Sequence, residues 1–411
     1  MIYQNFSTRQ NLAMTWWNRP GLKEYRGIVC DGSIRSGKTV SMAVGFVLWS
    51  MGTFNGQSFA ICGKTIASLR RNVIRLLPQL LEGIVEIKER RSDNMLIIRA
   101  GSVTNYYFLF GGRDESSYTL VQGMTLAGVL FDEVALMPRS FVEQALARCS
   151  VEGSKIWFNC NPEGPMHWFY LEWIKQAKKR KILHLHFTME DNPSLSAAKK
   201  AEYENTYSGV FYDRYVRGLW ARSEGLIYPM FDKKKHIAYT MPAISLRHRY
   251  YVSIDYGTVN PFAAGLYDYD PVEHKVLMVK ELYYEGGSAD RVDNEKYYEM
   301  LCQLIGPYTI EYIVIDPSAS SMIETILKYG KYMVVQADND VINGIQDVTK
   351  YLNLGVLAFH ASCTKTFEEF EEYSWNEKAK EDAVIKEKDH SMDQLRYFCR
   401  TVLRNELAGI I

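Results

Sequence analysis

Cysteine is scarce in this sequence, with seven residues in 411 and no Cys-x-x-Cys pair. An odd number without paired spacing argues against a disulfide framework and a zinc ribbon, and it is typical of a reducing compartment. No run approaches the roughly eighteen apolar residues that a membrane span requires, and Met1–Asn5 lack the start of a secretion signal. Internal repeats and low-complexity tracts are also missing. We therefore expect a cytosolic protein that does not enter a membrane.

The chain has no net charge, but its charges are unevenly distributed. Residues 1–220 contain 27 Lys and Arg against 19 Asp and Glu, and the remainder contains 21 against 29. A front part that touches polyanions and a back part that gathers metal-binding carboxylates would have this distribution, and so would ordinary solvated faces. The length predicts two domains, each with its own core.

The most informative pattern is a phosphate-binding loop, Gly-Ser-Ile-Arg-Ser-Gly-Lys-Thr, which follows a short apolar run. In this pattern backbone N–H groups turn inward on phosphate oxygens, Lys38 reaches the β and γ phosphates, and Thr39 holds Mg²⁺. The loop residues expected to contact the nucleotide are Gly32, Ser33, Arg35, Ser36, Gly37, Lys38 and Thr39. The loop predicts hydrolysis of a nucleoside triphosphate such as ATP, with a Gly-rich turn before a core helix as the structural alternative.

A second half of the nucleotide site follows about a hundred residues later. The apolar residues Gly128–Phe131 lead directly into Asp132 and Glu133. We expect Asp132 to join the Mg²⁺ shell and Glu133 to orient and deprotonate the attacking water. A further strand ends in Asn159 and is followed by Asn161, two candidates for sensing the γ phosphate, although Asn-Pro is also an ordinary turn signal.

Four other polar residues are candidates for nucleotide contacts. Gln10 can present its amide to an adenine edge. Arg35, inside the loop, can pair with phosphate oxygens in the transition state as an arginine finger does. Arg113 and Arg148 are weaker candidates for a finger that reaches a neighbouring subunit.

Strands and helices alternate after the loop. Helices are expected over Val40–Met51 and Ile66–Leu77, with a strand at Ser58–Cys62 between them. A second unit begins near Tyr250, and the Gly-, Pro- and charge-rich stretch before it reads as a linker. The sequence thus predicts an α/β protein with domains at residues 1–220 and 241–411 and a linker at 221–240.

Three acids in the back half share one setting. Asp255 and Asp316 each follow a buried-looking strand, and Asp393 lies on a predicted helix. Such strands bring their end carboxylates together, and gathered like charges call for divalent metal. We expect these acids to hold two Mg²⁺ or Mn²⁺ ions, which would activate a water molecule for phosphodiester cleavage. Taken singly, each acid is also explained as an ordinary turn residue.

Other residues of the back half are secondary candidates. His390 lies three residues before Asp393, on the same helical face, and can assist as a ligand or proton carrier. Glu281 ends a strand predicted over Val276–Lys280 and is a candidate fourth ligand. The acidic run from Glu368 to Glu372 indicates a solvated helix face.

Two histidines in the front half, His184 and His186, alternate on a predicted strand and therefore face one side. Without a third ligand nearby, they are expected to be buried or interfacial rather than metal-bound.

In this order, the motifs resemble one family, the large terminase subunit of tailed bacteriophages and prophages, close to its PBSX-type branch. The residues that carry the resemblance are Phe6 to Gln10, Asp31 to Thr39, Phe131 to Glu133, Asn159 to Pro162, Gly218 to Trp220, Ser253 to Gly257, Ile315 to Pro317 and His390 to Tyr397. They cover almost the whole chain. Cys160 departs from the pattern, because many relatives have Ser or Thr near that segment.

The resemblance implies an N-terminal P-loop ATPase domain of RecA/ASCE-like fold and a C-terminal ribonuclease-H-like nuclease domain. It implies ATP-driven translocation of double-stranded DNA into a procapsid and cutting of concatemeric DNA. The implied partners are a small terminase subunit and the portal of the procapsid, with a ring of about five copies during packaging in the host cytoplasm. Lys38, Thr39, Asp132 and Glu133 would form the ATPase site, and Asp255, Asp316 and Asp393 the nuclease ligands.

Two alternatives remain open from the sequence. One is a host helicase-like or repair ATPase fused to a nuclease. The other is a non-catalytic nucleotide switch whose back half docks partners.

Overall fold

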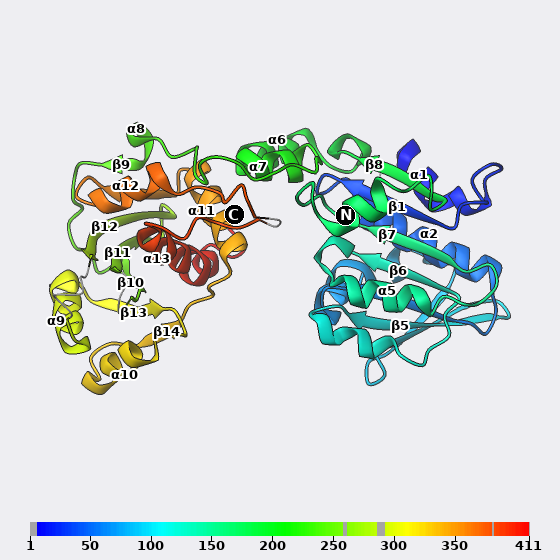
Figure 1. The fold of residues 1–411 in the computed structure, drawn as a ribbon, viewed down its shortest axis with the longest axis horizontal. Helices are drawn as coiled ribbons and strands as arrows, with labels where there is room; N and C mark the ends of the chain where they lie inside the picture. Colours follow the sequence, from blue (N-terminus) through cyan, green and yellow to red (C-terminus); the bar gives the residue numbers. More distant parts are fainter. Residues whose placement is uncertain (1–5, 258–260, 286–291, 380–381, 411) are drawn as a thin grey trace. The chain divides into compact units, whose positions relative to one another are not determined.

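The chain folds into two compact units in the computed structural model, which describes residues 6–257, 261–285, 292–379 and 382–410. The first unit comprises Met1–Tyr203 and Val210–Arg222, and the second comprises Glu204–Gly209 and Ser223–Ile411 (Figure 1). Met1–Asn5, which bear on the expected absence of a secretion signal, lie outside the described residues. Within the described ranges, every helix is too short or too polar to cross a bilayer.

The first unit is built on an eight-stranded sheet in the order β3-β4-β5-β2-β6-β7-β1-β8. Its strands are β1 (Gly27–Gly32), β2 (Ser58–Gly63), β3 (Glu86–Arg90), β4 (Met95–Ala100), β5 (Val103–Gly111), β6 (Gly128–Asp132), β7 (Lys155–Asn159) and β8 (Ile182–Phe187). Its helices are α1 (Thr8–Thr15), α2 (Lys38–Thr53), α3 (Ile66–Leu69), α4 (Leu77–Leu80), α5 (Arg139–Ala147), α6 (Ala197–Thr206) and α7 (Gly209–Phe211), the last two reaching into the second unit's residues. From β5 to β8 the strands run parallel, so their carboxyl ends share one edge.

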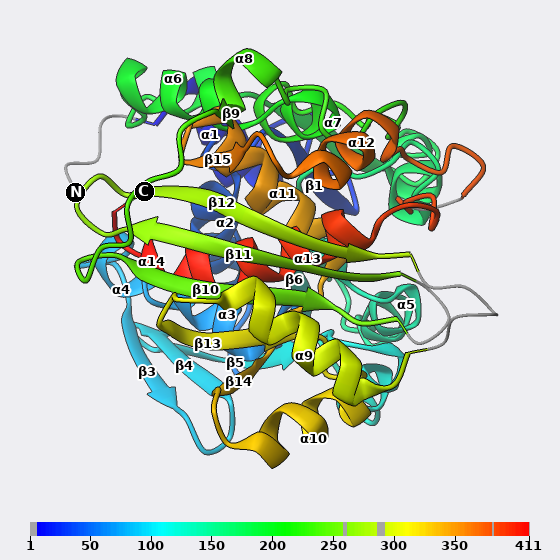
Figure 2. The same ribbon diagram turned by 90° about the vertical axis from the view of Figure 1, so that its left-hand side faces the viewer.

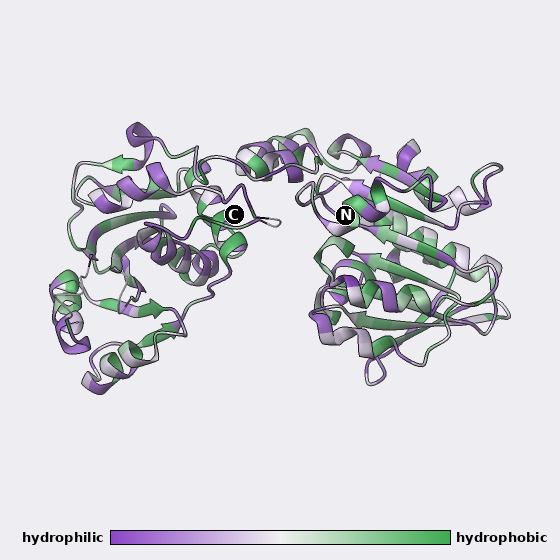
Figure 3. Ribbon diagram, viewed as in Figure 1, coloured by the Kyte–Doolittle hydropathy of each residue, from purple (hydrophilic) through white to green (hydrophobic). Residues whose placement is uncertain are grey.

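Helices cover both faces of this sheet. Along β1, Ile28 and Cys30 join the core that contains α2, whereas Val29 joins the core that contains α5. A parallel strand covered on both faces is apolar on both of its sides, and Figure 3 shows β6 as largely hydrophobic. These apolar runs, visible in the sequence, therefore position the polar residues that follow them.

One predicted helix of this unit is interrupted. The expected helix over 66–77 breaks into α3, a π-helical turn at Arg70–Ile74, and α4. Pro78 stands in the first turn of α4, where its missing N–H removes no helical hydrogen bond.

The second unit contains a seven-stranded sheet in the order β14-β13-β10-β11-β12-β15-β9, and Figure 2 shows β10, β11 and β12 side by side. Its strands are β9 (Ile237–Ala238), β10 (Arg249–Asp255), β11 (Phe262–Asp270), β12 (Lys275–Tyr284), β13 (Ile310–Ile315), β14 (Val334–Gln336) and β15 (Leu357–His360). Its helices are α8 (Lys233–His236), α9 (Asn294–Ile305), α10 (Ser320–Tyr329), α11 (Val341–Asn353), α12 (Thr364–Glu372), α13 (His390–Phe398) and α14 (Arg404–Glu406).

Alternation along β10 separates the two faces of this sheet. Val252 and Ile254 pack into the core shared with α9 and α10. On the opposite face the Ser253 hydroxyl donates to the Gln394 carbonyl of α13 at 2.7 Å. Asp255 is in register with that second face and therefore meets α13.

Both units are α/β, as the sequence predicts. The boundary falls between Arg222 and Ser223. Much of the stretch expected to be a linker packs within the second unit: Ile227 and Tyr228 are buried, and β9 pairs with β15.

Candidate nucleotide and nuclease sites

The phosphate loop lies between β1 and α2. Gly32 has a φ of +128°, and a side chain there would lie 1.9 Å from the Phe187 carbonyl oxygen. Gly37 has a φ of +86°, and a side chain would meet Gln10 Nε2 at 2.1 Å. Both positions therefore require glycine. The loop leaves the α2 N-terminus, with its unpaired N–H groups, facing a cavity of about 610 Å³.

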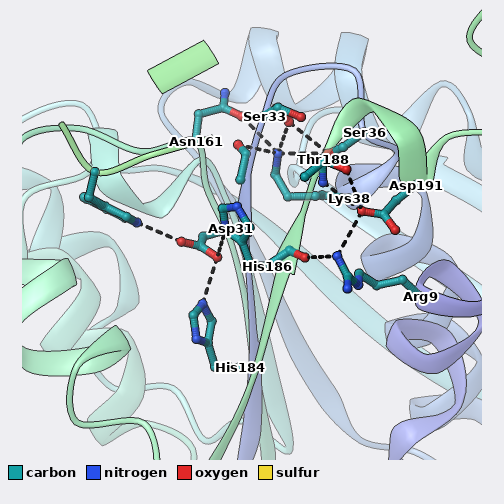
Figure 4. Close-up of polar contacts among 12 residues, drawn as sticks. Arg9, Asp31, Ser33, Ser36, Lys38, Asn161, His184, His186, Thr188 and Asp191 are labelled. Carbon is teal, nitrogen blue, oxygen red and sulfur yellow. Dashed lines mark hydrogen bonds and ion pairs between the residues drawn. The ribbon is translucent and has the colours of Figure 1, made fainter. Parts of the chain in front are cut away.

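Lys38 is buried and fully hydrogen-bonded within the loop (Figure 4). Its ammonium donates to the carbonyl oxygens of Gly32 and Ser33 at 3.0 and 2.6 Å, and to Asn161 Oδ1 at 3.1 Å. Burial lowers the pKa of Lys38 to about 8. The lysine therefore rests on the loop and on the polar segment after β7.

Thr39, Asp132 and Asn159 form a hydrogen-bonded trio at the carboxyl edge of the sheet. The Thr39 hydroxyl donates to Asp132 Oδ1 at 3.1 Å, and Asn159 Nδ2 donates to Thr39 Oγ1 at 2.8 Å. Burial raises the pKa of Asp132, while these two neighbours lower it. Asn159 Oδ1 and Ser33 Oγ are buried without a protein partner. Oxygen atoms with unused lone pairs suit Mg²⁺, and the unpaired Ser33 hydroxyl can also donate to a phosphate oxygen.

Glu133 lines the same cavity from a strained backbone. Its φ is +61°, in the left-handed region that non-glycine residues seldom adopt. Burial and the adjacent Asp132 raise the pKa of the Glu133 carboxyl. A carboxylate aimed into the cavity with increased basicity can accept a proton from water.

Arg35 also lines the cavity, but its side chain is bound elsewhere. Nε donates to the Tyr203 hydroxyl at 2.9 Å, and the guanidinium lies 5.8 Å from the Tyr203 ring centroid. Gln10 lines the cavity too, and Ser7 N donates to its Oε1 at 2.9 Å, so Nε2 is the part that faces Gly37. Arg113 and Arg148 are not among the cavity residues.

Sequence reasoning missed several residues of this cavity. Phe6, Arg71, Asn72, Asn192 and Ser194 line it. Arg71 lies within the helix expected over 66–77, and the π-helical turn that presents it has no signal in the sequence. Asn192 precedes Pro193, which reads as an ordinary turn.

In the second unit, two of the predicted acids lie at the ends of neighbouring strands. β10 and β13 run parallel with Ile254 opposite Ile315, so Asp255 and Asp316 follow at the same edge. Asp316 accepts from Ser318 N at 2.8 Å and from Asn339 Nδ2 at 2.9 Å, and these bonds lower its pKa against the opposing effect of burial.

Helix α13 adds the third acid and two assisting groups. His390 Nδ1 lies 2.8 Å from Asp255 Oδ2, and the Tyr397 hydroxyl lies 3.4 Å from Asp255 Oδ1. The pKa of Tyr397 is raised by burial and then by Asp255, Asp393 and Asp316. Each of the three carboxylates therefore disfavours ionisation of this phenol.

The charges of this site are balanced by cations of the chain itself. Asp393 Oδ2 lies 3.2 Å from the Lys386 ammonium, and Asp393 Oδ1 accepts from Arg396 at 2.5 Å. Among the described residues, no three His, Cys, Asp or Glu side chains are gathered as a metal-ligand group. Lys386, Arg396 and His390 therefore compensate part of the charge of Asp393 and Asp255, so the gathered acids do not by themselves require divalent metal, and the metal site stays a prediction. The carboxylate oxygens nevertheless suit Mg²⁺ or Mn²⁺.

Glu281 has a different environment from the one expected. The strand predicted to end at Lys280 continues to Tyr284, so Glu281 lies inside β12. Its oxygens accept from Lys365 N at 2.9 Å, and from Thr366 N at 3.0 Å, in the first turn of α12. It caps that helix, and a metal ion would have to displace these bonds.

One acid of the run on α12 is not solvated. Glu369 is only 3% exposed, and its Oε2 accepts from Ser391 N at 2.7 Å and Met392 N at 3.1 Å. It therefore holds the first turn of α13. The helical spacing of the acidic run alone could not distinguish Glu369 from its exposed neighbours, because the burial of Glu369 depends on the packing of α13 against α12.

Known proteins resemble this chain over part or nearly all of its length. Residues 29–235 match the family model described as terminase large subunit, T4likevirus-type, N-terminal. A solved structure of the large terminase from a thermophilic bacteriophage is 46% identical, with a TM-score of 0.90, over 97% of this chain and 100% of that one. The same terminase in complex with ADP is 45% identical over the same shares, with a TM-score of 0.87.

A more distant relative is the terminase large subunit of Escherichia phage T5. It is 21% identical over 299 residues, which are 68% of this chain and 66% of that protein. The match therefore spans just under two thirds of the T5 protein.

Proposed function

Because the chain belongs to the family of phage terminase large subunits, we propose that it is an ATP-driven DNA-packaging motor joined to a metal-dependent endonuclease. The family identified from the sequence motifs is confirmed, and the narrower PBSX-type branch stays a prediction. The observation that carries the proposal is the cavity onto which Lys38, Thr39 and the strained Glu133 converge. The large terminase of the thermophilic bacteriophage is described in complex with ADP and with ATP-γ-S, which supports a nucleotide at this position.

In the proposed ATPase site each residue has one task. Lys38 leaves the loop carbonyls and pairs with the β and γ phosphates, while Asn161 loses its partner and so reports the change to the segment after β7. Thr39 and Asp132 would hold Mg²⁺, which supplies charge neutralisation at the phosphates when bound. Glu133 accepts the proton of the attacking water.

Arg35 is the candidate arginine finger within the chain. Its guanidinium must release the Tyr203 hydroxyl to reach a phosphate. Gln10 Nε2 is the group that can select the adenine edge. Arg113 and Arg148 stay candidates for a finger that acts on another copy.

In the proposed nuclease site Asp255, Asp316 and Asp393 would hold two Mg²⁺ or Mn²⁺ ions. Such a pair supplies an activated water and stabilises the leaving 3′ oxygen when bound. His390 keeps Asp255 oriented and carries protons. Lys386 must leave Asp393 before that carboxylate can bind a cation.

The proposed partners follow from the proposed function, DNA packaging. Packaging must ignore DNA sequence, so contacts to backbone phosphates should dominate and binding should weaken steeply with salt. A small terminase subunit, a portal and a ring of about five copies are the expected assembly in the host cytoplasm.

Crossed variants test the two activities. Lys38→Ala should abolish ATP turnover and leave Mn²⁺-dependent DNA cutting unchanged, and Asp255→Ala should do the reverse. Survival of both activities in either variant would contradict the site assignments. A nucleotide switch would show no metal-dependent cutting in the unchanged protein.

A further inference from the structure

Two sequence motifs without an assigned role, His184/His186 and Gly218 to Trp220, meet at one buried carboxylate. Asp31 precedes the phosphate loop directly and is 1% exposed. Its Oδ1 lies 2.8 Å from His184 Nε2 and 3.1 Å from His186 Nδ1 (Figure 4). Its Oδ2 accepts from Trp220 Nε1 at 2.8 Å.

Asp31 is ionised in this arrangement. Burial opposes ionisation, but the hydrogen bonds from His184, His186 and Trp220 hold its pKa well below the ordinary value. A carboxylate can only accept, so His184 donates through Nε2 and His186 through Nδ1. Three donors on one buried carboxylate fix its orientation, and with it the backbone at the start of the loop.

The segment 215–220 also lies against the loop backbone. Ile34 N donates to the Tyr215 carbonyl at 2.9 Å. Gly218 has a φ of +74°, and a side chain there would lie 2.7 Å from Ser33 N. Trp220 stacks on Tyr170 with ring centroids 4.8 Å apart. The loop and this segment therefore share three points of close contact at Asp31, Ser33 and Ile34.

This segment is the last part of the first unit before the chain enters the second unit at Ser223. We propose that Asp31 and Trp220 form a positioning link, through which nucleotide occupancy of the phosphate loop changes the order of the segment 215–220. The link acts on neither phosphate nor water. The proposal rests on the proposed function in requiring that the loop bind ATP.

The test is hydrogen exchange of the full-length protein with and without ATP-γ-S. In the unchanged protein, ATP-γ-S should slow amide exchange across 215–220 by about fivefold or more. Trp220→Phe keeps an aromatic ring against Tyr170 but removes the N–H donor. It should bind ATP-γ-S within about threefold of the unchanged affinity and lose the nucleotide-dependent slowing.

Two further variants make the result decisive. Trp168→Phe is the matched control, because Trp168 lies beside the same His167 ring as Trp220 but has no bond to Asp31; it should keep the slowing. Asp31→Asn changes the other end of the link and should lose the nucleotide-dependent slowing as Trp220→Phe does. If one of these two variants fails to fold, the other still tests the link. Equal slowing in the unchanged protein, Trp220→Phe and Asp31→Asn would overturn the proposal, as would no slowing in an unchanged protein that binds ATP-γ-S. Failure of that protein to bind ATP-γ-S would instead contradict the proposed function.

Discussion

Glu133 combines a positive φ with a carboxyl whose pKa is raised by burial and by Asp132. A strained residue persists only where its surroundings hold it, and such residues concentrate at working sites. The sequence predicted that Glu133 follows a buried strand, but it did not predict the positive φ of Glu133. The positive φ combined with a buried carboxyl separates it from an ordinary turn acid.

Glu133→Gln should reduce kcat for ATP hydrolysis by about 10²- to 10⁴-fold, because an amide cannot accept the proton of the attacking water. Affinity for ATP-γ-S should stay within about threefold, since the side chain keeps its shape. Glu143→Gln, on an exposed residue paired with Arg139, is the control and should change neither quantity. A Glu133→Gln variant that retains more than about a tenth of kcat would exclude Glu133 as the base.

Glu369 predicts a pH dependence of stability. Burial raises its pKa to about 7 from 4.5. A carboxyl with a raised pKa in the folded protein contributes most below pH 4.5, and its contribution is lost as pH rises through 7. Glu369→Gln removes this titration and keeps an oxygen for Ser391 N. The unfolding free energy of the variant relative to the unchanged protein should therefore rise by about 2–3 kcal/mol between pH 4.5 and 7.5.

Denaturant unfolding at both pH values measures this difference. The exposed Glu372, paired with Lys388, provides the control in Glu372→Gln, whose relative stability should vary little with pH. A flat difference for Glu369→Gln would mean that its carboxyl titrates normally despite burial.

Among the elements, the strands that lead to the sites were the most predictable. β7 ends at Asn159 as expected, and β6 extends one residue beyond the apolar run Gly128–Phe131. Their apolar runs are typical of buried strands in a sheet that is covered on both faces. The Arg70–Ile74 turn, the burial of Glu369 and the cap at Glu281 could not be predicted, because each depends on an element distant in sequence.

Helix α12 and strand β12 give a prediction about Glu281. If Glu281 caps α12, Glu281→Ala should cost about 1–2 kcal/mol of stability and leave Mn²⁺ affinity within about twofold. Asp255→Asn should weaken Mn²⁺ binding instead. Calorimetric Mn²⁺ titration and denaturant unfolding of both variants separate the two roles. A large loss of Mn²⁺ affinity in Glu281→Ala would make Glu281 the fourth ligand.

At the scale of the whole molecule, the sequence predicted two α/β units and the order of their acidic motifs. The crossing between Arg222 and Ser223 lies within two residues of the predicted end of the first domain at 220, but a second excursion of the chain was not predicted. Residues 204–209 belong to the second unit, where the Thr206 carbonyl accepts from Asn353. The charge bias of the two halves did not reveal the Lys386 and Arg396 cations beside Asp393, because a regional sum hides local pairing.

DNA packaging is the central claim, and protection of DNA from nuclease inside procapsids measures it most directly. With linear DNA, ATP, portal-bearing procapsids and this chain, we expect DNA to become resistant to added DNase. Lys38→Ala should give no protection, whereas Asp255→Ala should still protect, because linear DNA needs no cut to enter. Protection by Lys38→Ala, or by the unchanged chain without ATP, would contradict the account.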